Sequence, residues 1–263
     1  MKYEMKVVTY NLMCVWDHPK NIRGLTYRAG LVYSKIKKEN PDIIGFQEVI
    51  APQLEYLEHM FPEYLFIGQG RNADMMGEGL YIAIKKSVFM LCGMDVFWIS
   101  PEPYVPATRF EEQSPYPRIC VDILVRHKES GKMIRIYDVH LDHEESEAKA
   151  KGMKVVLDKI SEDMQKVPAE IILLGDFNEK PYGPAITYIN EYKDIKLVDI
   201  TSSIPVSAHD YKENVTDHKI DYIFTSESLA KEADQVKIWD ENSHGIFLSD
   251  HYPISAVLSF DDI

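Results

Sequence analysis

Three features that each mark a class of protein are scarce in this sequence: cysteine, long apolar runs and positive charge. Its 263 residues contain only three cysteines, Cys14, Cys92 and Cys120, and their spacing matches no zinc-binding or redox pattern. An odd number of scattered cysteines argues against a disulfide scaffold. We interpret all three as small buried side chains.

Apolar residues never run long enough to suggest a membrane protein. No stretch approaches the ~18 consecutive apolar residues that a spanning helix requires. The first residues, MKYEMKVVTYNL, lack the apolar core and small-residue cleavage site of a signal peptide. We therefore expect a soluble, cytoplasmic protein with no transmembrane segment, and the sequence predicts no obligate protein partner.

Negatively charged residues outnumber positively charged ones. The sequence has 29 Lys and Arg residues and 42 Asp and Glu residues, which gives a formal net charge of −13. Proteins that grip duplex DNA usually carry a basic surface, so this balance argues against a large DNA-binding face. An anionic substrate remains compatible with it, because a bound metal ion reverses the field inside a pocket. Solubility alone explains the acidic surface equally well.

The pattern of apolar residues predicts many strands and few helices. The composition, 45% hydrophobic and 27% charged, fits one globular domain over residues 1–263. Successive strands often lack a helix between them, which favours an α/β (α+β) sandwich of packed sheets with flanking helices over a doubly wound parallel sheet. Helices are predicted over 23–39, from 51 onward and over 144–165, and strands over 5–11, 42–47, 80–84, 88–99, 119–126, 133–141, 170–174, 219–225 and 252–260.

Residues 100–118 interrupt this order with a proline-rich segment. Proline cannot donate to a strand ladder, and a structureless loop of this length is usually functional or disordered. Its aromatic residues Tyr104, Phe110 and Tyr116 are candidates for the rim of a substrate cleft. A surface loop pinned by its own aromatics is an equally good interpretation.

Polar residues follow several of the predicted core strands. Asp176 and Asn178 come after the strand 170–174 and Gly175, and in extended chain they face the same way. A carboxylate and an amide on one face can orient a water molecule and a phosphate oxygen. A turn closed by the Asp176 side chain is the structural alternative.

Glu48 and Asn11 also stand at strand ends. Magnesium prefers oxygen ligands, often one or two carboxylates, and Glu48 follows the strand 42–47. Taken alone, Glu48 is more typical of an acid at a helix N-terminus. Asn11 offers an amide oxygen at the end of the first strand.

Histidines and aspartates complete the polar set. His140 shares one strand face with Asp138 and Asp142, although a lone histidine is usually structural. Asp221 lies inside a hydrophobic strand, where a buried carboxylate is costly unless paired, and a histidine is its natural partner. The pair Asp250-His251 opens the final strand.

Together, and in their order along the chain, these segments resemble the endonuclease/exonuclease/phosphatase superfamily. That superfamily includes pancreatic deoxyribonuclease, abasic-site endonucleases, inositol-polyphosphate 5-phosphatases, neutral sphingomyelinases and deadenylases. GDFN and SDHYP are the most specific motifs, and DVFWISPEPYVP (95–106) with PRI (117–119) resembles a bacterial subgroup of metal-dependent hydrolases. The matching segments are TYNL (9–12), PDIIGFQEV (41–49), VHLDHE (139–144), LLGDFNEKP (173–181), KIDYIF (219–224) and SDHYPI (249–254).

The resemblance implies a four-layer sandwich of two mixed sheets and a hydrolase that uses one or two Mg²⁺ or Mn²⁺ ions. By similarity, Glu48 is the principal metal ligand, Asn11 lies beside it and Asp250 completes the metal environment. Asp176 would orient or deprotonate the attacking water. By the same resemblance, the phosphate would be contacted by Asn178, His140 and Arg118. His251, paired with Asp221, would act in proton transfer or charge stabilisation.

The substrate stays open between a phosphorylated small molecule, a lipid headgroup and a nucleic acid. Abasic-site endonucleases carry an aspartate two residues after the first asparagine, where this chain has Met13, so that branch is disfavoured. A catalytically inactive phospholigand-binding module is the alternative of another class. A glycosidase built on the many carboxylates would need no metal and leaves the histidines unexplained.

Overall fold

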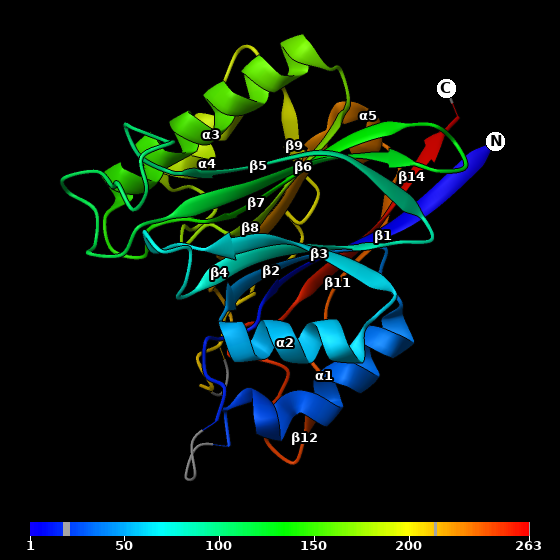
Figure 1. Ribbon diagram of the computed structural model, residues 1–263, viewed down its shortest axis with the longest axis vertical. Helices are drawn as coiled ribbons and strands as arrows, with labels where there is room; N and C mark the ends of the chain where they lie inside the picture. Colours follow the sequence, from blue (N-terminus) through cyan, green and yellow to red (C-terminus); the bar gives the residue numbers. More distant parts are fainter. Residues whose placement is uncertain (18–21, 213–214, 263) are drawn as a thin grey trace.

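The computed structural model describes residues 1–17, 22–212 and 215–262 of the chain. Within these residues, two mixed six-stranded sheets pack face to face, and helices cover both outer faces (Figure 1). The strand orders are β11-β14-β1-β2-β4-β3 and β5-β6-β7-β8-β10-β9. The expected four-layer sandwich is therefore confirmed.

The bounds of the elements follow. The first sheet consists of β1 (Lys2–Asn11), β2 (Ile43–Val49), β3 (Tyr64–Gly70), β4 (Gly79–Lys85), β11 (Ala233–Ile238) and β14 (Ile254–Asp261). The second consists of β5 (Phe89–Trp98), β6 (Ile119–His127), β7 (Met133–His140), β8 (Glu170–Asp176), β9 (Leu197–Asp199) and β10 (Asp221–Ser226). The helices are α1 (Leu25–Glu39), α2 (Ala51–Met60), α3 (Ser146–Lys166), α4 (Pro184–Glu191) and α5 (Glu227–Ala230), and β12 (Asn242–Ser243) pairs with β13 (Ile246–Phe247).

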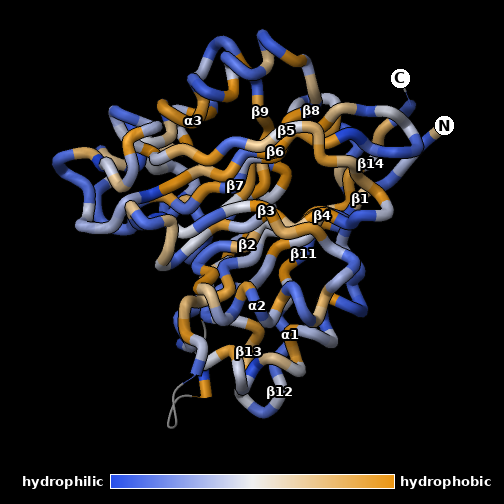
Figure 2. Tube along the Cα trace, viewed as in Figure 1, coloured by the Kyte–Doolittle hydropathy of each residue, from blue (hydrophilic) through white to orange (hydrophobic). Residues whose placement is uncertain are grey.

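Three apolar cores hold the four layers together. Branched side chains from both sheets, such as Val7, Ile136 and Ile172, fill the space between the sheets. The other two cores lie under the helices: Leu25 and Leu57 pack α1 and α2 on the first sheet, and Val156 of α3 packs on the second. Figure 2 shows the apolar colouring concentrated along the strands. Each sheet is thus buried on both faces, which explains its near-continuous hydrophobic runs.

Strand direction brings polar strand ends together. β1 and β2 run parallel in the first sheet, and β7 and β8 run parallel in the second. In register, His140 of β7 and Asp221 of β10 both pair with Asp176 of β8. The three side chains therefore lie side by side on the face of the second sheet that points toward the first sheet.

The predicted helices and core strands are present, with differences at their ends. The final strand begins at Ile254, so Asp250 and His251 precede it rather than open it. The elements that the sequence did not predict are strands β3, β9, β11, β12 and β13 and helices α4 and α5. No helix among the described residues is long and apolar enough to cross a membrane.

Candidate active site

A cavity of about 350 Å³ lies where the polar ends of the two sheets meet. It contains most of the site residues expected from the sequence, and Asn11 and Asp221 lie directly behind its wall, hydrogen-bonded to residues that line it. The lining residues are Cys14, Glu48, Arg71, Glu78, Tyr116, Arg118, His140, His143, Asp176, Asn178, Asp210, Asp250 and His251.

A break in strand pairing turns Glu48 toward the cavity. The register between β2 and β4 shifts between Phe46 and Val49, and Glu48 has a positive φ of 60°. Such a bulge re-aims a side chain at the end of a strand. Its Oε2 accepts the backbone N–H of Cys14 at 3.1 Å.

Asn11 connects carboxylates from the two sheets. Its Nδ2 donates to Glu48 Oε1 and to Asp176 Oδ2, each at 3.0 Å. Its Oδ1 accepts the backbone N–H of Met13 at 2.9 Å. The amide oxygen predicted to face a metal ion therefore faces the backbone, because the NH₂ group is directed at both carboxylates. Asn11 thereby holds the carboxylates of Glu48 and Asp176 close to each other.

Asp176 stands at the centre of the site. Its Oδ2 lies 3.5 Å from His140 Nε2 and 4.0 Å from His251 Nε2. Gly175 precedes it with a φ of 140°, and a side chain there would overlap the carbonyl oxygen of Val139. Burial, and then the neighbouring Asp221, raise the pKa of Asp176. Its negative charge is therefore unfavourable unless a cation lies close by.

Asn178 reaches the cavity through the turn that the sequence offered as the alternative to a shared strand face. Its φ of 48° breaks the extended chain, so Asp176 and Asn178 do not share a strand face as expected. Instead Asp176 Oδ1 accepts the backbone N–H of Asn178 at 2.9 Å, which closes a tight turn. Asn178 Nδ2 donates to the carbonyl of Leu141 at 3.1 Å and is anchored at the cavity wall.

The two histidines have opposite protonation tendencies. His251 Nδ1 lies 2.9 Å from Asp221 Oδ2, the expected pairing. Burial alone lowers the pKa of His251, but Asp221 and Asp176 outweigh it and hold the pKa well above its usual value. Burial, together with Arg118 and Arg71, holds the pKa of His140 well below its usual value. One histidine is thus a buried cation and the other a neutral donor or acceptor.

The donor set fits a divalent cation. Ligand atoms of Glu48, His140 and Asp176 all lie within 4.8 Å of one another. Among the described residues, Asp176 has ion-pair contacts only with histidines, and Glu48 has none. A buried carboxylate such as Asp176 needs a paired cation or a metal ion, and the half-buried Glu48 adds a second carboxylate beside it. Oxygen ligands suit Mg²⁺, and the imidazole extends the choice to Mn²⁺.

Two further predicted residues line the cavity with different surroundings. Asp250 Oδ1 accepts a hydrogen bond from Ser249 Oγ at 2.9 Å, and within the described residues it joins none of the candidate metal-binding groups. Arg118 is buried, and its Nη2 lies 2.9 Å from His143 Nδ1. Burial, and then Arg71, lower the pKa of Arg118.

Only part of the proline-rich loop reaches the cavity. Tyr116 lines it, whereas Tyr104 donates its hydroxyl to Asp95 on β5 at 2.8 Å and packs near Lys159 of α3. Phe110 is not a lining residue. Of the three aromatics predicted for a cleft rim, the structure therefore places one there, because the segment folds back on β5 and α3.

Five lining residues were missed from the sequence: Cys14, Arg71, Glu78, His143 and Asp210. Arg71 and Glu78 flank the tip between β3 and β4, and form an ion pair at 2.9 Å. No strand was predicted at β3, so the sequence did not bring this hairpin to the site. His143 alone had a signal, because it follows His140 in the VHLDHE segment.

Comparisons with known proteins agree with this geometry. A model described as "Endonuclease/Exonuclease/phosphatase family" matches residues 8–251. An uncharacterized protein of Acanthamoeba polyphaga mimivirus is 29% identical over 157 residues, covering 57% of this chain and 58% of that protein. The match thus spans less than two thirds of the viral protein's length.

Solved structures share the whole architecture. An endonuclease/exonuclease/phosphatase from Bacteroides vulgatus is 25% identical, with a TM-score of 0.85 over 97% of this chain and 98% of that one. The mannosyl-6-phosphatase of Bacteroides thetaiotaomicron VPI-5482 is 24% identical, with a TM-score of 0.84 over 97% of this chain and 100% of that one. At 24% identity, the similarity to the mannosyl-6-phosphatase shows a shared fold only.

Proposed function

Because the chain belongs to the endonuclease/exonuclease/phosphatase family, we propose that it hydrolyses phosphate esters by metal-assisted attack of water. The observation that carries the proposal is the convergence of Glu48, His140 and Asp176 within 4.8 Å beside the His251–Asp221 pair. Carboxylates, a neutral imidazole and an imidazolium at one point are the groups that phosphoryl transfer to water requires.

Mg²⁺ or Mn²⁺ is the proposed cofactor. Glu48 and Asp176 would hold the ion, Asn11 would keep the two carboxylates in position, and Asp250 would complete its surroundings. When bound, the ion supplies Lewis-acid stabilisation of the phosphate and of the leaving oxygen.

The residues of the chain would handle the water and the developing charge. Asp176 accepts a proton from the attacking water or orients it, because its Oδ2 is directed into the cavity between His140 and His251. Protonated His251, held by Asp221, donates to a phosphate oxygen and balances the charge of the transition state. Asn178 and His140 supply further polar contacts to the phosphate.

Substitution of the central residues tests the proposal. Asp176→Ala and His251→Ala are each expected to lower kcat by ~10²–10³, the typical cost of a lost transition-state donor or base. Purified variants would be assayed for phosphate release with Mg²⁺ or Mn²⁺, and with excess chelator. Asp234→Ala and His59→Ala, at exposed positions on β11 and α2, are matched controls. Wild-type turnover by pure, folded Asp176→Ala protein, or turnover that survives chelation, contradicts the mechanism.

An inactive phospholigand-binding module is the second candidate of another class. Each expected polar position holds a residue competent for chemistry, which favours the enzyme. A substrate panel separates the two: the module binds phosphorylated ligands without turning them over. The panel should include a sugar 6-phosphate, because one fold relative is a mannosyl-6-phosphatase, together with a lipid headgroup phosphate and DNA.

We also propose a reducing, cytoplasmic setting. The three cysteines are free. Only Cys120 is buried, Cys14 is half-buried and Cys92 is exposed, so the interpretation of all three as buried side chains was wrong for Cys92. Disulfides are the usual fate of exposed thiols in oxidising compartments. Fractionation of cells that express the tagged chain would test the location.

A further inference from the structure

A buried arginine at one end of the cavity lacks partners for part of its guanidinium group. Arg118 is only 4% exposed, and among the residues that the structure describes its Nε and Nη1 have no hydrogen-bond partner. The carboxylate of Asp142 is 4.0 Å from Nε, and its Oδ1 is already engaged by Ser114. A buried charge that is only partly compensated is unfavourable, so we infer that Arg118 is arranged for an anion that comes from outside the protein.

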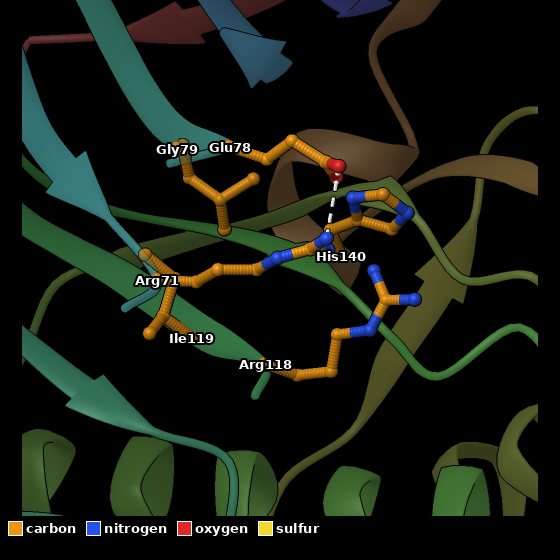
Figure 3. A pocket seen from close by; sticks show the side chains of 7 residues that line it. Arg71, Glu78, Gly79, Arg118, Ile119 and His140 are labelled. Atoms are coloured by element: carbon orange, nitrogen blue, oxygen red, sulfur yellow. Dashed lines mark ion pairs between the residues drawn. The ribbon is translucent and has the colours of Figure 1, made fainter. Parts of the chain in front are cut away.

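A second arginine reaches the same place from the first sheet. Arg71 is 8% exposed, pairs with Glu78 at 2.9 Å, and has its guanidinium 4.8 Å from the ring centre of Tyr116. Glu78 and Tyr116 thereby fix the direction of this side chain. Figure 3 shows the guanidinium ends of Arg71 and Arg118 converging beside the His140 ring.

The space directly beside the two arginines is narrow. A void of about 10 Å³ lies there, walled by Gly79, Leu80 and Ile119. That volume holds about one water molecule, so an alcohol substituent on a phosphate oxygen that faces the guanidinium groups has no room there.

On the basis of the proposed function, we propose that Arg71 and Arg118 bind the terminal oxygens of the phosphate that is hydrolysed. The substrate class is then a phosphomonoester rather than an internal phosphodiester. A monoester has three non-bridging oxygens and carries close to two charges at neutral pH. With one oxygen on the Glu48 and Asp176 side, two remain for the two guanidinium groups. A diester has one fewer non-bridging oxygen and one fewer charge, and a second ester arm directed at the arginines has no room in the narrow void beside them.

The reaction on such a substrate is balanced without further reactants. The oxygen of water bonds to phosphorus as the bond between phosphorus and the ester oxygen breaks. The departing alkoxide takes a proton and leaves as an alcohol, and inorganic phosphate remains on the arginines. Two guanidinium forks match the planar spread of phosphate oxygens, a match that an ammonium group lacks.

Kinetics on paired substrates test the inference. Wild-type protein is expected to hydrolyse p-nitrophenyl phosphate with a kcat/KM at least tenfold above that for bis(p-nitrophenyl) phosphate. Arg118→Lys and Arg71→Gln should each lower this selectivity at least tenfold. Arg126→Gln, at an exposed position on the same strand β6, is the matched control. A wild-type preference for the diester overturns the inference and leaves the proposed phosphoesterase standing.

Calorimetry supplies a readout independent of turnover. Inorganic phosphate should bind wild-type protein at least tenfold more tightly than dimethyl phosphate, and Arg118→Lys should abolish most of that difference while thermal melting shows a folded chain. Equal binding of the two anions overturns the inference. The inference also fails if the arginine substitutions change the hydrolysis of a sugar bisphosphate but not that of p-nitrophenyl phosphate. The arginines would then bind a second phosphate group that does not react. Selective phosphate binding without any hydrolysis supports the pocket and refutes the proposed function.

Discussion

At the scale of single residues, neighbouring charges give the side chains of His140 and His251 opposite protonation tendencies. His140 and His251 both lie within 4.0 Å of Asp176 Oδ2. His251 also has the carboxylate of Asp221 on Nδ1, whereas His140 faces Arg71 and Arg118. The cost of a buried carboxylate predicted a histidine partner for Asp221, and the family resemblance identified that partner as His251. It did not predict the neutral state of His140, because Arg71 lies far away along the chain.

Removing the charge of Asp221 tests this division of tasks. Asp221→Asn keeps the size of the side chain but no longer favours the imidazolium form of His251, so kcat should fall by ~10² or more with little change in KM. Steady-state kinetics on a phosphorylated substrate provide both values. Asp158→Asn, at a partly exposed position on α3, serves as a control. A kcat within threefold of wild type would rule out a catalytic contribution from the pair.

At the scale of elements, strand ends and their irregularities place the site. The hydrophobic runs at β1, β2, β7, β8, β10 and β14 were predictable, and so were the polar residues that follow them. The bulge at Glu48 and the positive φ of Asn178 were not, because each depends on pairing with a neighbouring strand or loop. The edge strand β11 was missed because its exposed residues are polar, and an edge strand needs no continuous apolar run.

Substitution of Gly175 tests how far the close approach of β7 and β8 depends on a residue without a side chain. An alanine at this position would overlap Val139 O and would have to adopt a φ of 140°, so Gly175→Ala should destabilise the protein by about 3 kcal/mol, as strained or overpacked core sites do. Gly30 of α1 meets no atom within 4 Å, and Gly30→Ala should instead stabilise by about 0.5–1 kcal/mol. Urea unfolding measures both. Equal effects of the two alanines would contradict the role given to Gly175.

At the scale of the whole molecule, ion pairs around the buried Glu39 join the helix layer to the first sheet. Glu39 at the end of α1 pairs with Lys6 of β1, Lys35 of α1 and Lys237 of β11. Burial alone raises the pKa of Glu39, but the hydrogen bonds from these lysines outweigh it and lower the pKa to about 2. A carboxyl with a depressed pKa stabilises the folded state above its unfolded pKa and loses that contribution as pH falls toward 2.

Stability measured against pH tests this connection. Glu39→Gln should cost about 2 kcal/mol of unfolding free energy at pH 7, and the difference from wild type should shrink between about pH 5 and pH 3. Glu58→Gln, at an exposed position on α2, should change stability by less than about 0.5 kcal/mol. A difference independent of pH would mean that Glu39 acts through packing. The same curves test the proposed single domain, which requires one cooperative transition.

The sequence by itself determined the two-sheet sandwich, because apolar runs and turn residues are local patterns. It also determined which strand ends carry Glu48, Asp176 and His251. Only the tertiary structure decided that Asn11 directs its NH₂ group at both carboxylates and that Arg71, from a hairpin the pattern did not predict, stands beside Arg118. Hydrogen bonds, burial and the proximity of charges depend on segments that are far apart in the chain. The proposed site for a terminal phosphate rests on such contacts between Arg71 and Arg118.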